Sequence, residues 1–477
     1  MVNEKKMISA YGDDALGTLD GIGVAGKIAN GDISASDAVE AAIARAKAVN
    51  PTLNAIVTDT FDMAVQQAKQ SLSGPFAGVP TFIKDTDDYA GTPTLWGSRA
   101  IPQKQKKKSS EFVKQFLSLG FVCLGKSALP EFGLTATTES LAFGRTRNPW
   151  NTDHSTGGSS GGSAAMVAAG VVPMAHGNDG GGSIRIPAAC CGLVGLKPTR
   201  NRLKNVAGTE LLPVNIVHQG VLTRTVRDTA AFYAGAEKYY RNPKLPEMGL
   251  VEHADKKRLR IGLFTDTPFG KPSHPETSDL AMQTGLLCSK LGHHVEDMPC
   301  PFNAEMGSSF TAYWGMMAFS IGTFGKILVC PGFDKSMLED WSLGMGRLFQ
   351  KNFWKMPSII GQLKKFLGLY NDIFRKYDVI LSPTLAHPPP ELGFIGPEVP
   401  FDEAFARVSH YASFTPAQNV SGAPAITLPM GVSQNGLPIG IQLAAASGQE
   451  KMLLALAYEL EEAKPWPRIG ETFLRKC

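Results

Sequence analysis

Short apolar runs alternate with longer amphipathic stretches along most of the chain. The apolar runs have the length of strands and are bounded by glycine, proline or charged residues. The strands that they predict lie at 79–83, 122–125, 258–264, 377–381, 425–430 and 439–443. The amphipathic stretches predict helices at 111–119, 162–170, 226–236 and 450–462. Strands that alternate with helices in this way predict an α/β protein, in which helices cover a layered sheet.

The first part of the chain has helical periodicity. Residues 14–49 predict two helices, and Ser36 is placed to cap the second of them. The Asn50–Pro51 step predicts the end of that helix, because the residue before a proline disfavours the helical conformation.

Residues 302–370 differ from the rest of the chain in composition. Aromatic and methionine side chains gather there, at Phe310, Tyr313, Trp314, Met316, Met317, Phe319 and Phe324. We interpret this stretch as a helical subregion within a single domain that spans residues 1–477. Such a cluster is more often a second hydrophobic core than a ligand site. One of its faces can nevertheless form the wall of an apolar substrate pocket, because methionine and aromatic surfaces adapt to ligands.

Composition narrows the classes of protein. The chain has 477 residues, of which 43% are hydrophobic and 19% charged, which predicts a folded protein. The net charge of +4 is too small to indicate a nucleic-acid partner. The N-terminus lacks the apolar core of a signal peptide, and no uncharged apolar stretch reaches 18 residues, so we expect a cytoplasmic protein with no membrane segment. The seven cysteines form no CxxC pair, which favours reduced thiols over disulfides or zinc.

Candidate chemistry centres on the glycine- and serine-rich stretch 156–187. It holds Ser159 in GGSSGG and Ser183 in GGGSIR. Glycine-rich sequence is typical of flexible linkers, but this stretch lies mid-chain between apolar segments. Glycines let backbone N–H groups approach a ligand closely. A serine on such a turn can act as a nucleophile while neighbouring N–H groups stabilise the oxyanion.

Two other hydrolytic schemes fit the sequence less well. The segment GGSSG matches GxSxG, but a nucleophile elbow needs a strand directly before its serine, and residues 151–156 are polar and turn-like. His154 is too close to serve as the usual downstream base, although His387 and His410 remain candidates. A metal hydrolase is disfavoured, since the sequence has no HExxH motif and no paired CxxC.

A third scheme uses Lys84, Ser159 and Ser183. These residues stand in GVPTFIKD, GGSSGGSAA and GNDGGGSIRIPA, and their order and spacing are similar to those of the amidase signature family. The resemblance covers nearly the whole chain. Its further segments are NPWN at 148–151, GLVGLKPT at 192–199, GVLTRTVRD at 220–228, YDVILSPT at 377–384 and NVSGAPAITLPMG at 419–431.

The resemblance implies a mechanism and a fold. Burial disfavours the charged form of lysine, so a neutral Lys84 can accept a proton from Ser159, which in turn accepts one from Ser183. By the same resemblance, Ser183 attacks the carbonyl carbon and Ser159 passes the proton to the leaving amine. A cis peptide bond is expected between Gly158 and Ser159. The implied fold is an α/β/α layered amidase signature fold with a central twisted mixed β-sheet and the helical subregion.

The resemblance also implies an oxyanion hole and exposes two departures from the common pattern. The hole is expected from backbone N–H groups of Gly180, Gly181, Gly182 and Ser183. Positions 178 and 180 are often threonine in the family, but here they are Asn178 and Gly180. Gly180 is expected to widen the acyl site or loosen the loop. Asp179 and Arg185 are expected to be structural partners, not proton carriers.

The segment HGND at 176–179 resembles a subgroup of bacterial amidases, such as the 6-aminohexanoate cyclic dimer hydrolases. The resemblance implies hydrolysis of C–N bonds other than peptide bonds in linear or cyclic carboxamides, with carbamates and esters within reach. It implies a small-molecule amide substrate, no metal and no cofactor; a homodimer remains open.

Three alternatives stay open. One is the amidase subunit of a glutamyl-tRNA(Gln) amidotransferase, against which the HGNDGGGS variant and the aromatic region argue. Another is a urethanase that acts mainly on carbamates. The third is a non-catalytic relative, against which the intact Lys84, Ser159 and Ser183 argue.

Overall fold

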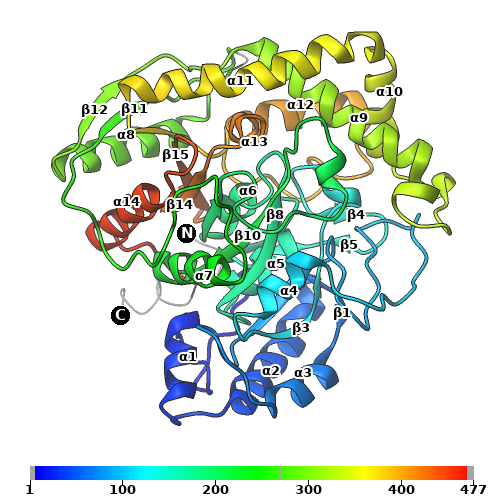
Figure 1. Ribbon diagram of the computed structural model, residues 1–477, viewed down its shortest axis with the longest axis vertical. Helices are drawn as coiled ribbons and strands as arrows, with labels where there is room; N and C mark the ends of the chain where they lie inside the picture. Colours follow the sequence, from blue (N-terminus) through cyan, green and yellow to red (C-terminus); the bar gives the residue numbers. More distant parts are fainter. Residues whose placement is uncertain (1–5, 269, 470–477) are drawn as a thin grey trace.

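An eight-stranded mixed sheet forms the centre of the protein, whose computed structural model describes residues 6–268 and 270–469 (Figure 1). Its strand order is β12-β11-β13-β15-β14-β9-β10-β8. The strands are β8 Met174–Asp179, β9 Val194–Lys197, β10 His218–Thr223, β11 Arg260–Leu263, β12 His294–Asp297, β13 Val379–Pro383, β14 Ala425–Val432 and β15 Pro438–Ala445. β11 pairs in parallel with β12 and β13, and the other neighbours are antiparallel. The predicted α/β class with a mixed sheet is therefore confirmed.

A smaller sheet carries Lys84. It has the order β1-β3-β2, with β1 Ile56–Asp59, β2 Pro80–Lys84 and β3 Val122–Ser127. β2 is buried along its whole length and ends at Lys84, as its apolar sequence predicts. The Thr81 hydroxyl donates to the Met174 carbonyl at 3.0 Å, so β2 lies against β8 of the large sheet. This contact brings the end of β2 to the strand that precedes Ser183.

Helices cover both sheets (Figure 1). In this view α1–α3 lie at the bottom, α9–α11 run along the top, and α14 lies at the left. The helices outside the aromatic stretch are α1 Gly21–Ala29, α2 Ala35–Leu53, α3 Phe61–Ala68, α4 Glu111–Leu117, α5 Gly161–Ala168, α6 Arg185–Cys191, α7 Val226–Tyr239, α8 Pro275–Lys290, α12 Phe401–Tyr411, α13 Pro416–Ser421 and α14 Glu450–Ala463. None of the helices in the described ranges is long and apolar enough to cross a membrane.

The boundaries predicted for α2 are wrong at both ends. Its N-cap is Ser34 and not Ser36, because Ser34 and Asp37 exchange hydrogen bonds in a capping box that Ser36 cannot form. The helix also continues past Pro51 to Leu53. Proline removes only one hydrogen-bond donor there, and its position in the last turn limits the loss.

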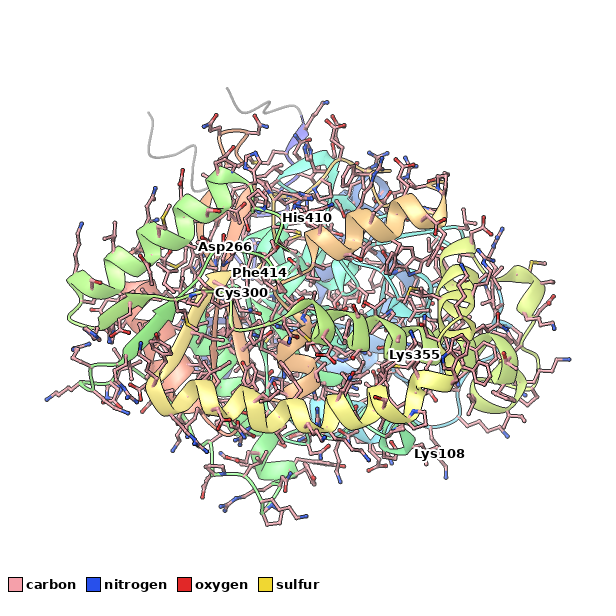
Figure 2. The ribbon with its side chains drawn as sticks, turned by 90° about the horizontal axis from the view of Figure 1, so that it is seen from above. Lys108, Asp266, Cys300, Lys355, His410 and Phe414 are labelled. Carbon is pink, nitrogen blue, oxygen red and sulfur yellow. The ribbon has the colours of Figure 1, made fainter. Side chains whose placement is uncertain are left out.

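Helices occupy most of the stretch rich in aromatic residues. They are α9 Ala304–Leu328, α10 Asp340–Gln350 and α11 Met356–Lys376, and Figure 2 shows α9 and α11 across one side of the molecule. Tyr313 and Tyr370 are fully buried in an apolar cluster between these helices and the sheet. Phe310 and Trp314, on the same helix as Tyr313, are only partly buried. This stretch therefore both builds a second core and offers apolar side chains to a cavity.

The cysteines in the described part of the chain are free thiols, namely Cys123, Cys190, Cys191, Cys288, Cys300 and Cys330. Four of them are buried, and Cys300 and Cys330 are partly exposed. Cys477 lies outside the described residues.

Candidate active site

Three separate segments bring the predicted catalytic residues together. Lys84 ends β2, Ser159 lies in the turn before α5, and Ser183 lies in the turn between β8 and α6. The Lys84 amine is 2.7 Å from the Ser159 hydroxyl oxygen. The Ser160 N–H donates to the Ser183 carbonyl at 3.3 Å, so the two serine turns are in contact. The Gly158–Ser159 peptide bond is cis, which confirms the prediction for this turn.

The Lys84 amine is removed from solvent. Its side chain is fully buried, and Ser159 is only 2% exposed. Burial lowers the pKa of Lys84 to about 7, against the opposing effect of the Asp179 and Asp87 charges. A lysine with this pKa is largely neutral in mildly alkaline solution. It can therefore accept a proton from the Ser159 hydroxyl.

Asp179 and Arg185 hold the Ser183 turn in place. Arg185 binds both oxygens of Asp179, through Nε at 2.9 Å and Nη2 at 3.0 Å. Burial opposes ionisation of Asp179, but Arg185, Lys197 and Asn419 outweigh that effect and hold its pKa at about 2. The carboxylate also accepts the Ile184 N–H at 3.2 Å. A carboxylate this strongly paired cannot exchange protons near neutral pH, which fits the predicted structural role.

The backbone N–H groups before Ser183 are not equivalent. The Gly182 N–H donates to Asp179 Oδ1 at 2.7 Å, so it is already used. Among residues 6–268 and 270–469, the N–H groups of Gly180, Gly181 and Ser183 have no hydrogen-bond acceptor. These three N–H groups are therefore available to an oxyanion. The fourth predicted donor, Gly182, would first have to leave Asp179.

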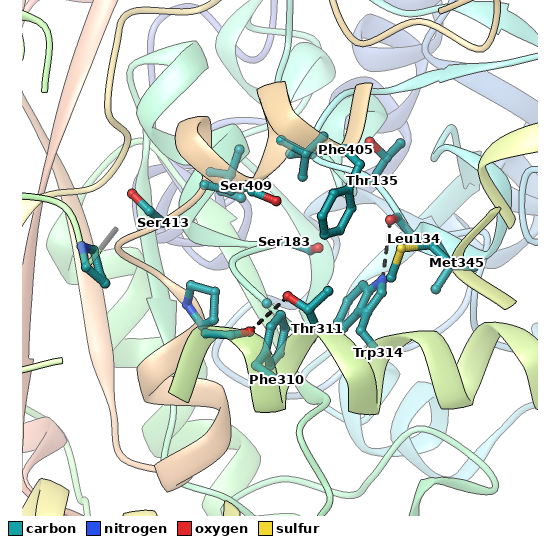
Figure 3. A pocket seen from close by; sticks show the side chains of 18 of the residues that line it. Leu134, Thr135, Ser183, Phe310, Thr311, Trp314, Met345, Phe405, Ser409 and Ser413 are labelled. Carbon is teal, nitrogen blue, oxygen red and sulfur yellow. Dashed lines mark hydrogen bonds between the residues drawn. The ribbon is translucent and has the colours of Figure 1, made fainter. Parts of the chain in front are cut away.

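An apolar cavity opens beside Ser183 (Figure 3). Helix α9 supplies much of its wall, and α10, α12 and the loop at 134–136 supply further parts, together with residues of the Ser183 turn, α6 and α13. Its large side chains are Met306, Phe310, Trp314, Trp341, Met345 and Phe405. The indoles of Trp314 and Trp341 both donate to the Leu134 carbonyl, at 3.4 and 2.6 Å, which fixes their orientation. The described residues that line the cavity include no Asp, Glu, His, Lys or Arg.

The expectation that Gly180 widens the acyl site is wrong. A Cβ atom at Gly180 would lie 3.3 Å from the Trp314 ring, and one at Gly181 would lie 3.0 Å from Phe310 Cζ. The aromatic rings of α9 therefore fill the space that larger side chains would need. Glycine suits both positions because these rings pack directly against the backbone there.

The other candidate bases lie elsewhere. In the described part of the chain, neither His387 nor His410 forms a hydrogen bond to Ser159 or Ser183. The segment expected to be turn-like contains a short strand, β7 Asn151–Ser155, because it pairs with β6 Arg147–Asn148 in a two-stranded ribbon. This strand lies outside the central sheet, so it does not make the elbow geometry. No group of metal-binding side chains occurs within the described ranges.

Sequence reasoning missed two features of the site. Asn178 contacts the Lys84 amine at 2.7 Å, although the sequence marked it only as a departure from threonine. Phe405 lines the cavity from α12, outside the stretch 302–370 that was expected to form a pocket wall. The departure at position 178 was a signal for the first feature. The second could not be found without knowing how α9, α10 and α12 pack.

The sequence and the fold were compared with those of known proteins. The family model described as "Amidase" matches residues 37–454. The "Putative amidase AmiC" of Mycobacterium leprae is 46% identical over 97% of this chain and 98% of its own length. The "6-aminohexanoate-cyclic-dimer hydrolase" of Paenarthrobacter ureafaciens is 34% identical, covering 92% and 93% respectively. A solved structure of 6-aminohexanoate cyclic dimer hydrolase with substrate superposes with a TM-score of 0.86, at 32% identity, covering 95% of this chain and 98% of the other.

Proposed function

The chain belongs to the amidase signature family and is an amidase, a hydrolase of carbon–nitrogen bonds, and from this premise we propose that it cleaves small, uncharged, largely apolar carboxamides through an acyl-enzyme on Ser183. The observation that carries the substrate class is the cavity beside Ser183. Its walls are largely aromatic and aliphatic, with a few Ser and Thr hydroxyl groups, and its lining among the described residues has no Asp, Glu, His, Lys or Arg.

In the proposed acylation step, Ser183 Oγ attacks the carbonyl carbon of the amide. The Ser183 proton passes to Ser159, and the Ser159 proton passes to neutral Lys84. The oxyanion accepts hydrogen bonds from the backbone N–H groups of Gly180, Gly181 and Ser183. Support comes from the 2.7 Å contact between Lys84 and Ser159 and from the unused amides at the Ser183 turn.

Collapse of this intermediate breaks the C–N bond. The relay then runs backwards, so that Ser159 gives its proton to the leaving amine and takes one from Lys84. Water attacks the Ser183 ester by the same route and releases the carboxylic acid. Every proton that leaves a nucleophile is returned to a leaving group, and the cycle needs no other reactant.

The cavity disfavours charged substrates. Free glutamine carries an ammonium and a carboxylate group, and an apolar wall would leave both unpaired at a high desolvation cost. This argues against the amidotransferase alternative. A cyclic amide dimer has no charged chain ends, and an aryl amide is likewise uncharged. Nothing in the lining distinguishes an amide from a carbamate or an ester, so we expect side activity on both.

Hydrolysis of a substrate panel tests this proposal. The panel holds a neutral anilide, a cyclic amide dimer, an aryl carbamate, a p-nitrophenyl ester and glutamine. We expect turnover of the uncharged amides by the wild type and by Ser358→Ala, a control at an exposed serine on α11, but not by Ser183→Ala. Activity confined to glutamine would contradict the substrate class, and a preference for carbamates would favour the urethanase alternative. A homodimer and a cytoplasmic location remain predictions.

A further inference from the structure

Three polar atoms surround the Lys84 amine. Ser159 Oγ lies at 2.7 Å, Asn178 Oδ1 at 2.7 Å and the Asn178 carbonyl oxygen at 3.4 Å. Asn178 therefore contributes two of the three atoms from one residue. Lys84 and Asn178 are both buried, so water does not compete for these contacts.

The orientation of the Asn178 carboxamide is fixed from its far side. Its Nδ2 group donates to the Thr86 hydroxyl at 2.7 Å. The Thr86 hydroxyl in turn donates to Asp87 Oδ2 at 3.1 Å. Because the amide nitrogen must face Thr86, the amide oxygen must face Lys84.

A second chain of hydrogen bonds runs from the Lys84 backbone to the same carboxylate. The Lys84 N–H donates to His176 Nδ1 at 3.1 Å, which leaves the His176 proton on Nε2 for Gln219 Oε1 at 2.8 Å. Gln219 Nε2 donates to both oxygens of Asp87, at 3.0 and 3.1 Å. Burial lowers the pKa of His176 to about 4, so this ring is neutral at pH 7. Both chains start at Lys84 and end at Asp87, so together they form a closed circuit of hydrogen bonds that includes Lys84.

We propose that Asn178, oriented by Thr86, is a positioning residue that directs the lone pair of the neutral Lys84 amine at the Ser159 hydroxyl. A neutral amine has two N–H groups and one lone pair. The two oxygens of Asn178 accept the two N–H groups, so the lone pair is left for Ser159. Without Asn178 the amine can rotate and direct an N–H at Ser159, which cannot then transfer its proton. This inference rests on the function proposed above.

Few charges act on the amine. Asp87 and Asp179 are the anions whose fields reach Lys84. His176 is neutral, and Lys126 on the neighbouring β3 is paired with Asp85 at 2.8 Å. Asn178 adds no charge of its own, so a substitution there changes the charge around Lys84 only if it introduces one.

Two substitutions of similar size test the proposal with opposite expectations. Asn178→Leu removes the side-chain oxygen that faces Lys84 and the side-chain NH2 group that faces Thr86, and it leaves the backbone carbonyl of residue 178 in place. Loss of the side-chain oxygen destabilises the charged form of Lys84. We expect kcat to fall about 10- to 100-fold with KM changed by less than about threefold, and the acid limb of the pH profile to move to lower pH. Asn178→Asp keeps an acceptor but places a negative charge beside the amine. The acid limb should then move to higher pH by about one unit or more.

Thr86→Val provides an independent variant in case either substitution at position 178 prevents folding. It leaves the Asn178 side chain in place but removes the hydroxyl that orients it. We expect a smaller loss of kcat than for Asn178→Leu, and a slower covalent labelling of Ser183 by a serine-directed phosphonate. Asn242→Leu is the matched control for activity and should turn over substrate as the wild type does, because the Asn242 side chain bonds to Asn201 and Lys244 and to no residue of the site.

The outcomes separate this inference from the proposed function. Lys84→Ala is measured in parallel and should lose activity. One set of results overturns the positioning role but leaves the proposed function standing. In this set Lys84→Ala is inactive, and the two Asn178 variants either move the acid limb in the same direction or leave both the acid limb and kcat unchanged. If the Asn178 variants do not fold and Thr86→Val labels at the wild-type rate, the role is overturned as well. If Lys84→Ala remains fully active, both the proposed function and this inference fail.

Discussion

The Lys84 amine lies 2.7 Å from the Ser159 hydroxyl, although the two residues are 75 positions apart in the chain. Lys84 ends a strand of the small sheet, and Ser159 lies in the turn before α5. Both side chains are removed from solvent. This contact turns an ordinary strand-end lysine into a candidate base, because burial weakens its hold on the proton.

The pH dependence of hydrolysis should report the charge state of Lys84. Its pKa is lowered to about 7 by burial, and only the neutral amine can accept a proton. We therefore expect kcat/KM for an uncharged amide to be low in acid and to rise with pH through about 7. The measurement is a pH–rate profile with a substrate that does not ionise between pH 5 and 10.

A control for that profile is the stability of the enzyme across the same range, followed by circular dichroism. A profile that is flat between pH 5.5 and 8.5, or that falls through pH 7, would contradict a neutral Lys84 base.

The contact between Gly180 and Trp314 should limit what position 180 tolerates. Gly180→Thr restores the residue common in the family, but its Cβ would already lie 3.3 Å from the Trp314 ring. We expect kcat/KM for an anilide to fall at least about tenfold, because the turn that holds Ser183 must shift. Adding Trp314→Leu to this variant should recover part of the loss, since it removes the clash.

The matched control is Gly361→Ala on α11, where a new Cβ meets nothing within 4 Å. It should leave activity unchanged and stabilise the helix slightly. Equal activity of Gly180→Thr and the wild type would show that the indole moves aside without cost.

The buried pair of Arg185 and Asp179 should be important for stability. Arg185→Met leaves the Asp179 carboxylate buried and without its counter-ion, which costs about 3–5 kcal/mol of unfolding free energy. Arg260→Met breaks an exposed pair with Asp378 and should cost much less unfolding free energy than Arg185→Met, because water screens the exposed charges. Urea denaturation of both variants at pH 7 measures the difference. Similar losses in the two variants would contradict the argument from burial.

Much of the sheet could be predicted from sequence, because its strands are short apolar runs with clear ends. β2 is an example: a strand is predicted at 79–83 and found at Pro80–Lys84, a difference of one residue at each end. The end of α2 was less predictable. The capping box of Ser34 and Asp37 begins the helix before Ser36, and the last turn tolerates Pro51, so both boundaries differ from those that single residues predict.

The candidate catalytic residues could be predicted because they stand in compact motifs. The composition of 302–370 suggested one wall of the cavity, to which Trp314 contributes, but the place of Phe405 on α12 could not be predicted because it depends on long-range packing of the helices. The role of Gly180 illustrates this. Its missing side chain suggested extra space, but a ring 134 positions later in the chain fills that space.

Direct detection of the acyl-enzyme tests the central claim. The enzyme is mixed with a p-nitrophenyl ester of an apolar acid, quenched in acid within the first turnover, digested and examined by mass spectrometry. The account predicts that the acyl group is found on the peptide that contains Ser183, and that Ser183→Ala carries none. An acyl group on Ser159 or on another residue, or acylation that persists in Ser183→Ala, would contradict the account.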